Sequence, residues 1–383
     1  MHIATSKIAL KKNGQGKRLR IAQVAPLYES VPPKQYGGTE RVVSVLTEEL
    51  VRLGHDVTLF ASGDSMTSAR LVPVCPESLR TSSQCIDQLA HHMVMIEQVM
   101  QAKKNFDLIH FHIDYLHFPL SRREQVVSLS TLHGRLDLPD LVPIYQVFRD
   151  MPVVSISDAQ RTPLPWINWQ GTVHHGLPER RYSFYPKGNG YLAFLGRTSP
   201  EKGLDRAIEI AMRAHMPLKI AAKVDKVDAE YFNSVIKPLL DNPLVEFLGE
   251  IGYPEKNEFL GNAAAVLFAI DWPEPFGLVM IEAMACGTPV IAFNRGSVPE
   301  VMNDGVSGFV VSDVEGAVRA VQNLSSISRR AVRRHFEEHF TGARMAEDYL
   351  GIYHRLVARE PEDLAVSNGV LSWMKLESPS NTT

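Results

Sequence analysis

The sequence predicts an α/β protein made of two Rossmann-like parallel-sheet domains that face each other across a cleft. The chain has 383 residues, which is long for a single core, and its 45% hydrophobic and 22% charged residues are typical of a soluble globular protein. Short apolar runs alternate with stretches of helical periodicity, the pattern of parallel strands joined by crossover helices. The alternation breaks near residues 166–190 and then begins again. We therefore expect two domains joined by a linker.

The N-terminal unit begins with a predicted strand at 19–25, followed by a proline-containing loop that ends at Gly37 and Gly38. Apolar residues at helical spacing then predict a helix, with Thr39 as its N-cap and Gly54 as its stop signal. The next strand is expected at 56–61. The remaining elements predicted for this unit are a helix near 86–103 and strands at 107–112, 125–132 and 151–157.

The C-terminal unit repeats the alternation of predicted strands and helices. Strands are predicted at 191–195, 218–223, 245–248, 264–269 and 289–293, with helices at 204–215 and 230–240 and a last helical stretch at 336–358. We expect a flexible tail at 1–18, an N-terminal domain at 19–175, a C-terminal domain at 176–345, a further helix at 346–358, and a disordered tail at 360–383.

Charge and cysteine usage narrow the class of protein. The net charge of −3 gives no general attraction to nucleic acid, and we interpret the basic clusters at 7–20 and 329–334 as solvated surface. The three cysteines lack metal-ligand spacing and favour a reducing compartment. No apolar stretch approaches the ~20 residues that span a bilayer. These observations predict a cytoplasmic protein.

Candidate ligand-binding residues follow predicted strands, where open parallel sheets bind ligands. Gly37 and Gly38 precede a helix N-terminus, an arrangement that suits an anion but is also that of a flexible turn. In "GRTSPEKG", Arg197 and Lys202 lie five residues apart after a strand. Two cations in that position suit a diphosphate better than a merely solvated surface.

The stretch "EPFGLVMIEAMACGTPV" contains two carboxylates in unusual surroundings. Glu274 lies between prolines, just before a predicted helix, and Glu282 lies within the apolar run of that helix. The first amides of the helix, at Phe276, Gly277 and Leu278, are expected to point at a ligand. A buried carboxylate needs hydrogen-bond donors. The hydroxyls of a bound sugar would serve Glu282, and so would an internal ion pair.

These motifs carry a resemblance to a known family. Glu274 and Glu282 form an E-x7-E pair, and "YGGTERVV", "TLHG", "FLGRTSPEKGLDRAI" and "VPEVMNDGVSGFVV" accompany it. Over about residues 19–358 the chain resembles the retaining family-4 glycosyltransferases of GT-B fold. The resemblance implies metal-independent transfer of a hexosyl group from a nucleoside diphosphate sugar to an acceptor hydroxyl, with no cofactor. It also implies that the domain at 19–175 is the acceptor side, that the domain at 176–345 is the nucleotide-sugar side, and that the helix at 346–358 returns to the first domain.

The resemblance also implies roles for individual residues. Glu282 resembles the glutamate that holds the nucleotide ribose, and Glu274 the one at the donor sugar, where the amides of Phe276, Gly277 and Leu278 contact sugar and phosphate. Arg197 and Lys202 match the pair that binds the diphosphate. Gly38, with Gly37 beside it, matches the glycine-loop contact, and His133 matches the histidine beside the donor sugar. The loop at 249–256, which contains Ile251, is expected on the base side.

Two features of the sequence do not follow this scheme. "HFHIDYLH" at 110–117 resembles a dizinc motif, but Tyr115 stands where that motif needs histidine, so we discard a metal hydrolase. In "GTVHHGLP", His175 replaces the asparagine that the family commonly has. This departure leaves the overall interpretation intact and affects local contacts between the domains.

Other functions and partners stay open at this point. A GT-B nucleotide-sugar epimerase and a non-catalytic nucleotide-binding protein are the alternatives. The acceptor, expected near 32–38 and 136–145, is a carbohydrate, a lipid-linked sugar or a small molecule. No nucleic acid partner is expected, and membrane-surface contact and oligomeric state are undecided. Two domains across a cleft also predict closure on donor binding.

Overall fold

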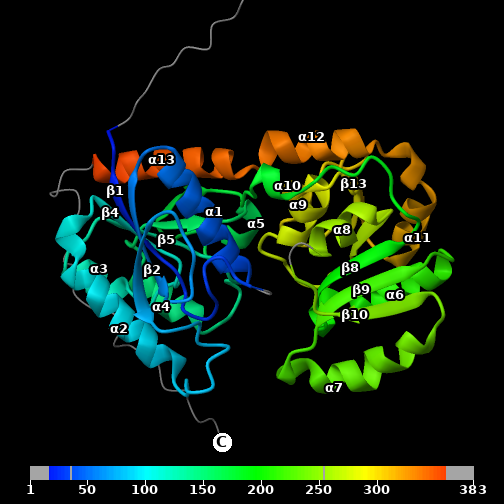
Figure 1. The fold of residues 1–383 in the computed structure, drawn as a ribbon, viewed down its shortest axis with the longest axis horizontal. Coiled ribbons are helices and arrows are strands. Elements are labelled where there is room, and N and C mark those ends of the chain that lie inside the picture. Colours follow the sequence, from blue (N-terminus) through cyan, green and yellow to red (C-terminus); the bar gives the residue numbers. More distant parts are fainter. Residues whose placement is uncertain (1–16, 35–36, 253–254, 359–383) are drawn as a thin grey trace, which may run out of the picture.

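The computed structural model describes residues 17–34, 37–252 and 255–358 of the chain. Residues 1–16 and 359–383 lie outside this part, so the two predicted tails fall almost wholly beyond the described residues. The described chain forms two parallel sheets (Figure 1), seven strands in the order β3-β2-β1-β4-β5-β6-β7 and six in the order β10-β9-β8-β11-β12-β13. The predicted α/β fold of two Rossmann-like domains is confirmed.

The first sheet belongs to the N-terminal domain, in which buried apolar strands alternate with helices. Its strands are β1 (Arg20–Val24), β2 (Asp56–Ser62), β3 (Arg70–Cys75), β4 (Leu108–Phe111), β5 (Ser128–Thr131), β6 (Val153–Ser155) and β7 (Trp169–Thr172). Its helices are α1 (Gly38–Arg52), α2 (Gln88–Gln101), α3 (Phe118–Arg123), α4 (Leu141–Val147) and α5 (Asp158–Arg161).

The second sheet belongs to the C-terminal domain and is built in the same way. Its strands are β8 (Leu192–Arg197), β9 (Leu218–Lys223), β10 (Val245–Gly249), β11 (Ala265–Phe268), β12 (Val290–Phe293) and β13 (Gly308–Val311). Its helices are α6 (Leu204–Arg213), α7 (Ala229–Tyr231), α8 (Glu255–Asn262), α9 (Leu278–Ala285), α10 (Val298–Val301), α11 (Val314–Gln322) and α12 (Arg329–His339).

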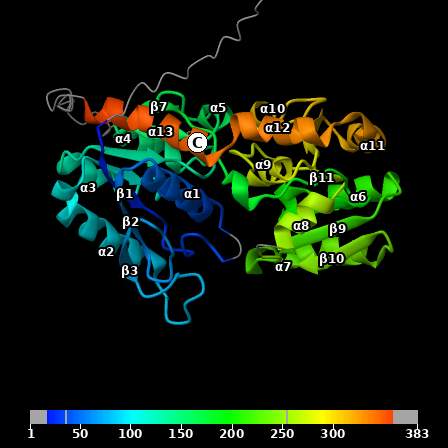
Figure 2. The ribbon, with the colours of Figure 1, turned by 45° about the horizontal axis from the view of Figure 1, so that its top comes forward.

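The chain crosses between the domains twice, and the two crossings are joined. Leu177 of the outgoing segment forms a parallel bridge with Thr341 of the returning one. The Arg344 guanidinium donates to the carbonyl of His174 over 2.6 Å. Figure 2 shows α12 and α13 (Gly342–Val357) following each other along both domains. Helix α13 packs on α1 and buries Tyr349 and Tyr353 in the N-terminal domain.

Several predicted elements differ from the observed ones. Thr39 is not the N-cap of α1, because the helix begins two residues earlier than that N-cap predicts, at Gly38, and its N-cap is Gly37. Strand β3 was not predicted, and β7 lies inside the segment interpreted as linker. Both are edge strands with partly exposed residues. Pro73 interrupts the apolar run of β3, and β7 has few apolar residues. The last helical stretch is two helices, and the predicted boundary at 345/346 falls inside α13.

The basic cluster at 329–334 is not simply solvated surface. The Arg329 guanidinium donates to the carbonyls of Tyr185, Ala263 and Gly261 over 2.6–2.8 Å. Arg333 likewise donates to the carbonyl of Tyr182 over 2.9 Å. These two arginines tie α12 to loops of the C-terminal domain. The predicted helical stretch began only at residue 336, after the cluster, and the carbonyls that the arginines bind come from segments far away in the chain.

Candidate active site between the domains

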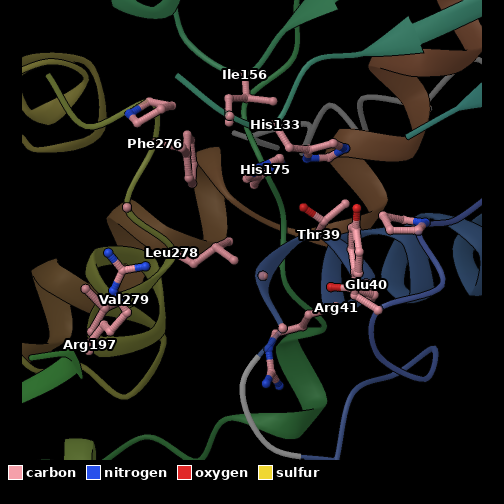
Figure 3. Close-up of a pocket in the computed structure, with 18 of the residues that line it drawn as sticks. Thr39, Glu40, Arg41, His133, Ile156, His175, Arg197, Phe276, Leu278 and Val279 are labelled. Carbon is pink, nitrogen blue, oxygen red and sulfur yellow. The ribbon is translucent and has the colours of Figure 1, made fainter. Parts of the chain in front are cut away.

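A cleft of about 660 Å³ separates the two domains (Figure 3). Its walls are formed by segments that follow the carboxyl ends of strands in both sheets, as the topology of parallel sheets predicts. Thr39, Glu40 and Arg41 of α1 line one side, and Phe276, Leu278 and Val279 line the other. All of the sequence-predicted site residues line this one cleft; they are Gly37, Gly38, His133, Arg197, Lys202, Ile251, Glu274, Phe276, Gly277, Leu278 and Glu282.

Glu282 lies on α9 with only 3% of its surface exposed. Its carboxylate accepts from Lys256 Nζ and from the Tyr182 hydroxyl, each over 3.1 Å, and lies 3.9 Å from Arg41 Nε. Burial raises the pKa of Glu282, but the two cations outweigh burial and lower this pKa below its usual value. The internal ion pair considered at the sequence level is therefore present, and one of its cations comes from the N-terminal domain.

Glu274 lies in the loop between β11 and α9, close to Lys202. The Lys202 ammonium is 2.5 Å from Glu274 Oε2, and the Trp272 indole N–H donates to the same oxygen over 3.0 Å. The Lys202 ammonium also lies 4.7 Å from the centre of the Trp272 ring. Trp272 was not predicted as a site residue, although it stands two positions before Glu274 in "DWPEPFG". The contact orients the carboxylate at the cleft wall.

Arg197 ends β8 and is held by two carboxylates. It donates to Glu201 over 2.9 Å, and its Nε lies 3.0 Å from Asp228 Oδ2 without the alignment of a hydrogen bond. Arg197 and Lys202 therefore line one cleft, as expected, but each is paired with acidic groups. A ligand phosphate must compete with those carboxylates for the cations.

The N-terminus of α9 opens onto the cleft. Gly277 is its N-cap with a φ of 80°, and a Cβ there would lie 2.9 Å from the Phe268 ring, so the turn needs glycine. The first amides of a helix have no partner within the helix and carry the positive end of its dipole. The Phe276 carbonyl is held by the Ser297 hydroxyl over 2.9 Å. This geometry can hold an anion.

The glycine pair starts α1 on the opposite wall. A Cβ on Gly37 would lie 2.7 Å from Pro33 Cβ, whereas a Cβ on Gly38 would make an ordinary contact, 3.5 Å from Leu278 Cδ1. Gly38 thus faces the C-terminal domain directly across the cleft.

His133 follows β5 and stands among other imidazoles. Its Nε2 lies 2.9 Å from Nδ1 of His112, and its ring stacks on His175 at 5.4 Å between centroids. Burial lowers the pKa of His133 to about 3, so the imidazole is neutral at pH 7. His175, the departure from the family pattern, also contacts the Phe276 ring at 4.8 Å. It therefore belongs to the cleft wall and not only to the crossing segment.

The structure adds residues that sequence reasoning missed. Arg41, Lys256 and Tyr182 surround Glu282, and Asp114 lines the cleft with a backbone φ of 50°. Desolvation by the surrounding protein raises the pKa of Asp114 to about 6, although the residue is open to the cleft. Arg41 lies in the first turn of α1, three residues after Gly38. This position after the glycine pair is the one sequence signal that could have predicted that Arg41 lines the cleft. The expected base-side loop lines the cleft through Ile251, and Tyr253 and Pro254 lie outside the described residues.

The histidines of "HFHIDYLH" are used in packing. His110, His112 and His117 are buried and bonded separately to hydroxyl, amide and imidazole partners. Within the described part of the chain, no group of three or more His, Cys, Asp or Glu side chains is arranged to hold a metal ion. None of the helices described is long and apolar enough to cross a bilayer.

Comparison with known proteins identifies the class of enzyme. Residues 36–169 match the family described as Glycosyltransferase Family 4, and residues 179–338 match the family described as Glycosyl transferases group 1. The two matches follow each other and divide where the structure divides into two sheets. The protein is a glycosyltransferase of GT-B fold. More narrowly, the chain belongs to the family-4 glycosyltransferases of this fold.

Relatives support this assignment over nearly the whole chain. The chain is 24% identical to the O-antigen chain mannosyltransferase C of Escherichia coli, over 88% of this chain and 99% of the relative. Sucrose-phosphate synthase from Thermosynechococcus elongatus has the same fold, with a TM-score of 0.73 at 19% identity over 89% and 100% of the two chains. Anabaena HepE in complex with UDP-glucose gives a TM-score of 0.66 at 16% identity, over 88% and 100%.

Proposed function

We propose that this glycosyltransferase moves a hexosyl group from a nucleoside diphosphate sugar to an acceptor hydroxyl, with retention of the anomeric configuration and without a metal ion. The observation that carries the proposal is the placement of Arg197, Lys202 and the N-terminus of α9 around one cleft, with Glu274 and Glu282 beside them. Cations and free amides at one end suit a diphosphate, and carboxylates suit the hydroxyls of ribose and sugar.

Each group then has a role in the transfer. Glu282 accepts hydrogen bonds from the ribose hydroxyls, and Ile251 lies on the base side. Arg197, Lys202 and the amides of Phe276, Gly277 and Leu278 bind the diphosphate. As the bond between the anomeric carbon and the phosphate oxygen breaks, negative charge grows on the leaving diphosphate, and these groups stabilise it.

The acceptor attacks from the side on which the diphosphate leaves. Its oxygen forms the new bond to the anomeric carbon, and its proton passes to the departing phosphate oxygen, which balances the reaction. Gly37 and Gly38 allow the backbone to approach the donor, while Glu274 and His133 lie at the sugar. The positive groups of the cleft carry out the charge stabilisation for which other enzymes use a metal ion, so EDTA should leave the rate unchanged.

The acceptor side of the cleft is lined by the N-terminal domain. Asp114 and Tyr28 face it there and can bind hydroxyls, so we propose a carbohydrate, a lipid-linked sugar or a small polyol as acceptor. Of the three free cysteines two are buried, which suits a reducing compartment, and we propose that the reaction takes place in the cytoplasm.

The test begins with donor binding. Thermal unfolding is measured with UDP, GDP and ADP and with their glucose, mannose and N-acetylglucosamine conjugates, with and without EDTA. A ligand at a hundred times its Kd stabilises the native state by about 2.7 kcal/mol, and we expect one nucleotide to do so in the wild type and not in Glu282→Gln. Donor hydrolysis and transfer to added acceptors are then followed by mass spectrometry.

The alternatives give different results in the same assays. An epimerase converts its nucleotide sugar without an acceptor, and a non-catalytic protein binds without turnover. Binding that requires a divalent ion, or a product of inverted configuration by NMR, would overturn the corresponding part of the proposal.

A further inference from the structure

Gln23 is a polar residue near the carboxyl end of the apolar strand β1. It is fully buried, and in the sheet it pairs with His110 of the neighbouring strand β4. A buried amide must place both of its polar ends on partners, because an unpaired end costs about 1–3 kcal/mol. The partners of Gln23 therefore show what this residue is for.

Those partners lie in two directions. The Gln23 Nε2–H donates to the Tyr353 hydroxyl of α13 over 3.1 Å, and the Gln23 Oε1 lies 2.8 Å from His112 Nε2. His112 Nδ1 lies in turn 2.9 Å from His133 Nε2. One chain of hydrogen bonds thus runs from the returning helix α13, through the strand ends of the first sheet, to the cleft.

The direction of each bond follows from the chemistry of the groups. The amide oxygen of Gln23 only accepts, so His112 must carry its proton on Nε2. The Nδ1 of His112 is then an acceptor, and His133 must carry its proton on Nε2. The other nitrogen of His133, Nδ1, is left as a bare lone pair. It is buried and has no hydrogen-bond partner among the described residues.

We propose that Gln23 and His112 are positioning residues that hold His133 in the Nε2–H tautomer, so that its Nδ1 accepts a hydrogen bond from a hydroxyl of the bound donor sugar. This inference rests on the proposed function for the identity of the ligand, but the tautomer itself does not. A neutral acceptor selects a hydroxyl group and adds no charge beside the breaking bond. His133 is in this view a hydrogen-bond acceptor and not a general acid.

The same arrangement explains what the returning helix contributes to the cleft. The Tyr353 hydroxyl, which receives the Gln23 amide, is itself 2.7 Å from His110 Nδ1. His110 Nε2 is 2.8 Å from the Thr131 hydroxyl, which is 2.8 Å from the Tyr349 hydroxyl. Two tyrosines of α13 thereby anchor the network from behind. The packing of α13 against the N-terminal domain therefore helps to orient the imidazole of His133, to which the helix is linked through Gln23 and His112.

The tautomer is measured directly by NMR. The full-length protein is labelled with 15N-histidine, and the two ring nitrogens of His133 are assigned by their loss in His133→Asn. We expect proton-bearing Nε2 and bare Nδ1 in the wild type, with no change between pH 6 and 8. In Gln23→Leu, which removes the acceptor of His112, we expect His133 to populate both tautomers. A protonated Nδ1 in the wild type, or an unchanged His133 in Gln23→Leu, would overturn the proposal.

A matched control separates positioning from packing. Ser130 lies on the neighbouring strand β5, and its hydroxyl forms a buried hydrogen bond of 2.6 Å with His117. Ser130→Ala removes this bond, which is not part of the chain of bonds that leads to His133. It should leave the His133 tautomer and the transfer kinetics unchanged. If Gln23→Leu does not fold, Gln23→Met removes the same acceptor of His112 with a side chain of similar volume, and the His133 nitrogens are read in the same way.

Activity provides an independent readout. With the donor identified by the thermal-shift panel, Gln23→Leu should lower kcat about tenfold or more with little change in the Kd for the free nucleoside diphosphate, which lacks the sugar. Equal losses for nucleotide and sugar nucleotide would overturn the assignment to the sugar. A wild type without transferase activity but with the expected tautomer would instead contradict the proposed function and leave the positioning by Gln23 and His112 standing.

Discussion

The two walls of the cleft differ in the side chains that they present: paired charged groups on the C-terminal wall, and imidazoles around His133 on the N-terminal wall. The C-terminal wall carries Arg197, Lys202, Glu274 and Glu282, each held by an ion pair or hydrogen bond to a charged partner. Around His133, the N-terminal wall carries neutral imidazoles tied to amide, hydroxyl and imidazole groups, although Asp114 and Arg41 of the same domain also line the cleft. A diphosphate that gains charge needs cations, whereas a hydroxyl needs uncharged acceptors in fixed positions. The two sheets share a fold, and the difference lies in the loops that follow their strands.

The largest expected effect is on the C-terminal wall, at Glu282. Glu282→Ala leaves Lys256 buried without its anion, and we expect the free energy of unfolding to fall by about 3–5 kcal/mol. Urea unfolding followed by circular dichroism measures it. Adding Lys256→Met should restore part of the stability but not the stabilisation by nucleotide. A double variant that regains nucleotide binding would show that Glu282 serves the fold alone.

The next effect concerns catalysis at the same wall. Lys202→Ala removes a cation from the proposed diphosphate site, and we expect kcat to fall about 10²–10³-fold, the usual loss for one group that stabilises developing charge. Lys219→Ala is the matched control, because Lys219 pairs with Glu246 on the surface of the second sheet. Initial rates of transfer measure both. Similar rates in the two variants would place the leaving-group charge elsewhere.

The buried histidines around His133 should make the stability of the protein depend on pH. Burial lowers the pKa of His133 to about 3 and that of His112 well below its usual value, so in the folded state both stay unprotonated as the pH falls. The unfolded chain binds protons below about pH 6.5. Stability is therefore lost on acidification through pH 6.5, by up to about 1.4 kcal/mol per pH unit and histidine.

Urea unfolding at pH 7.5, 6.5 and 5.5 checks this slope. His133→Asn should reduce the slope by up to about one proton, even if its stability at pH 7.5 is lower. An unchanged slope would mean that His133 is protonated in the folded protein, which would contradict a neutral wall.

The smallest effect on stability is expected at Gly38, and its neighbour Gly37 provides the contrast. Gly37→Ala brings a Cβ within 2.7 Å of Pro33 Cβ, and overpacking of this kind costs about 1–3 kcal/mol. Gly38→Ala makes only a 3.5 Å contact with Leu278 and should leave stability within about 0.5 kcal/mol. Its effect should be a higher KM for the donor. An unchanged KM in Gly38→Ala would mean that Gly38 has no role in leaving room for a ligand.

Much of the C-terminal wall could be predicted because its residues lie close to one another in the sequence. Glu274, Phe276, Gly277, Leu278 and Glu282 lie within nine positions, and the prolines and glycines around them mark the loop and the start of the helix. The N-terminal wall was harder to predict. His133 was recognisable from the family resemblance, but nothing in the strand around Gln23 indicates that its partners are His112 and a tyrosine near the end of the chain.

The sequence by itself determined the two-domain α/β architecture, the buried strands and the loops that carry the charged residues, because periodicity and turn residues act over short distances. Only the tertiary structure decided that Lys256 and Arg41 meet at Glu282 and that α13 reaches the network behind His133. It also showed that Arg329 and Arg333 bind buried carbonyls. Such contacts join segments far apart in the chain, and their geometry depends on how both domains pack, which no local pattern encodes.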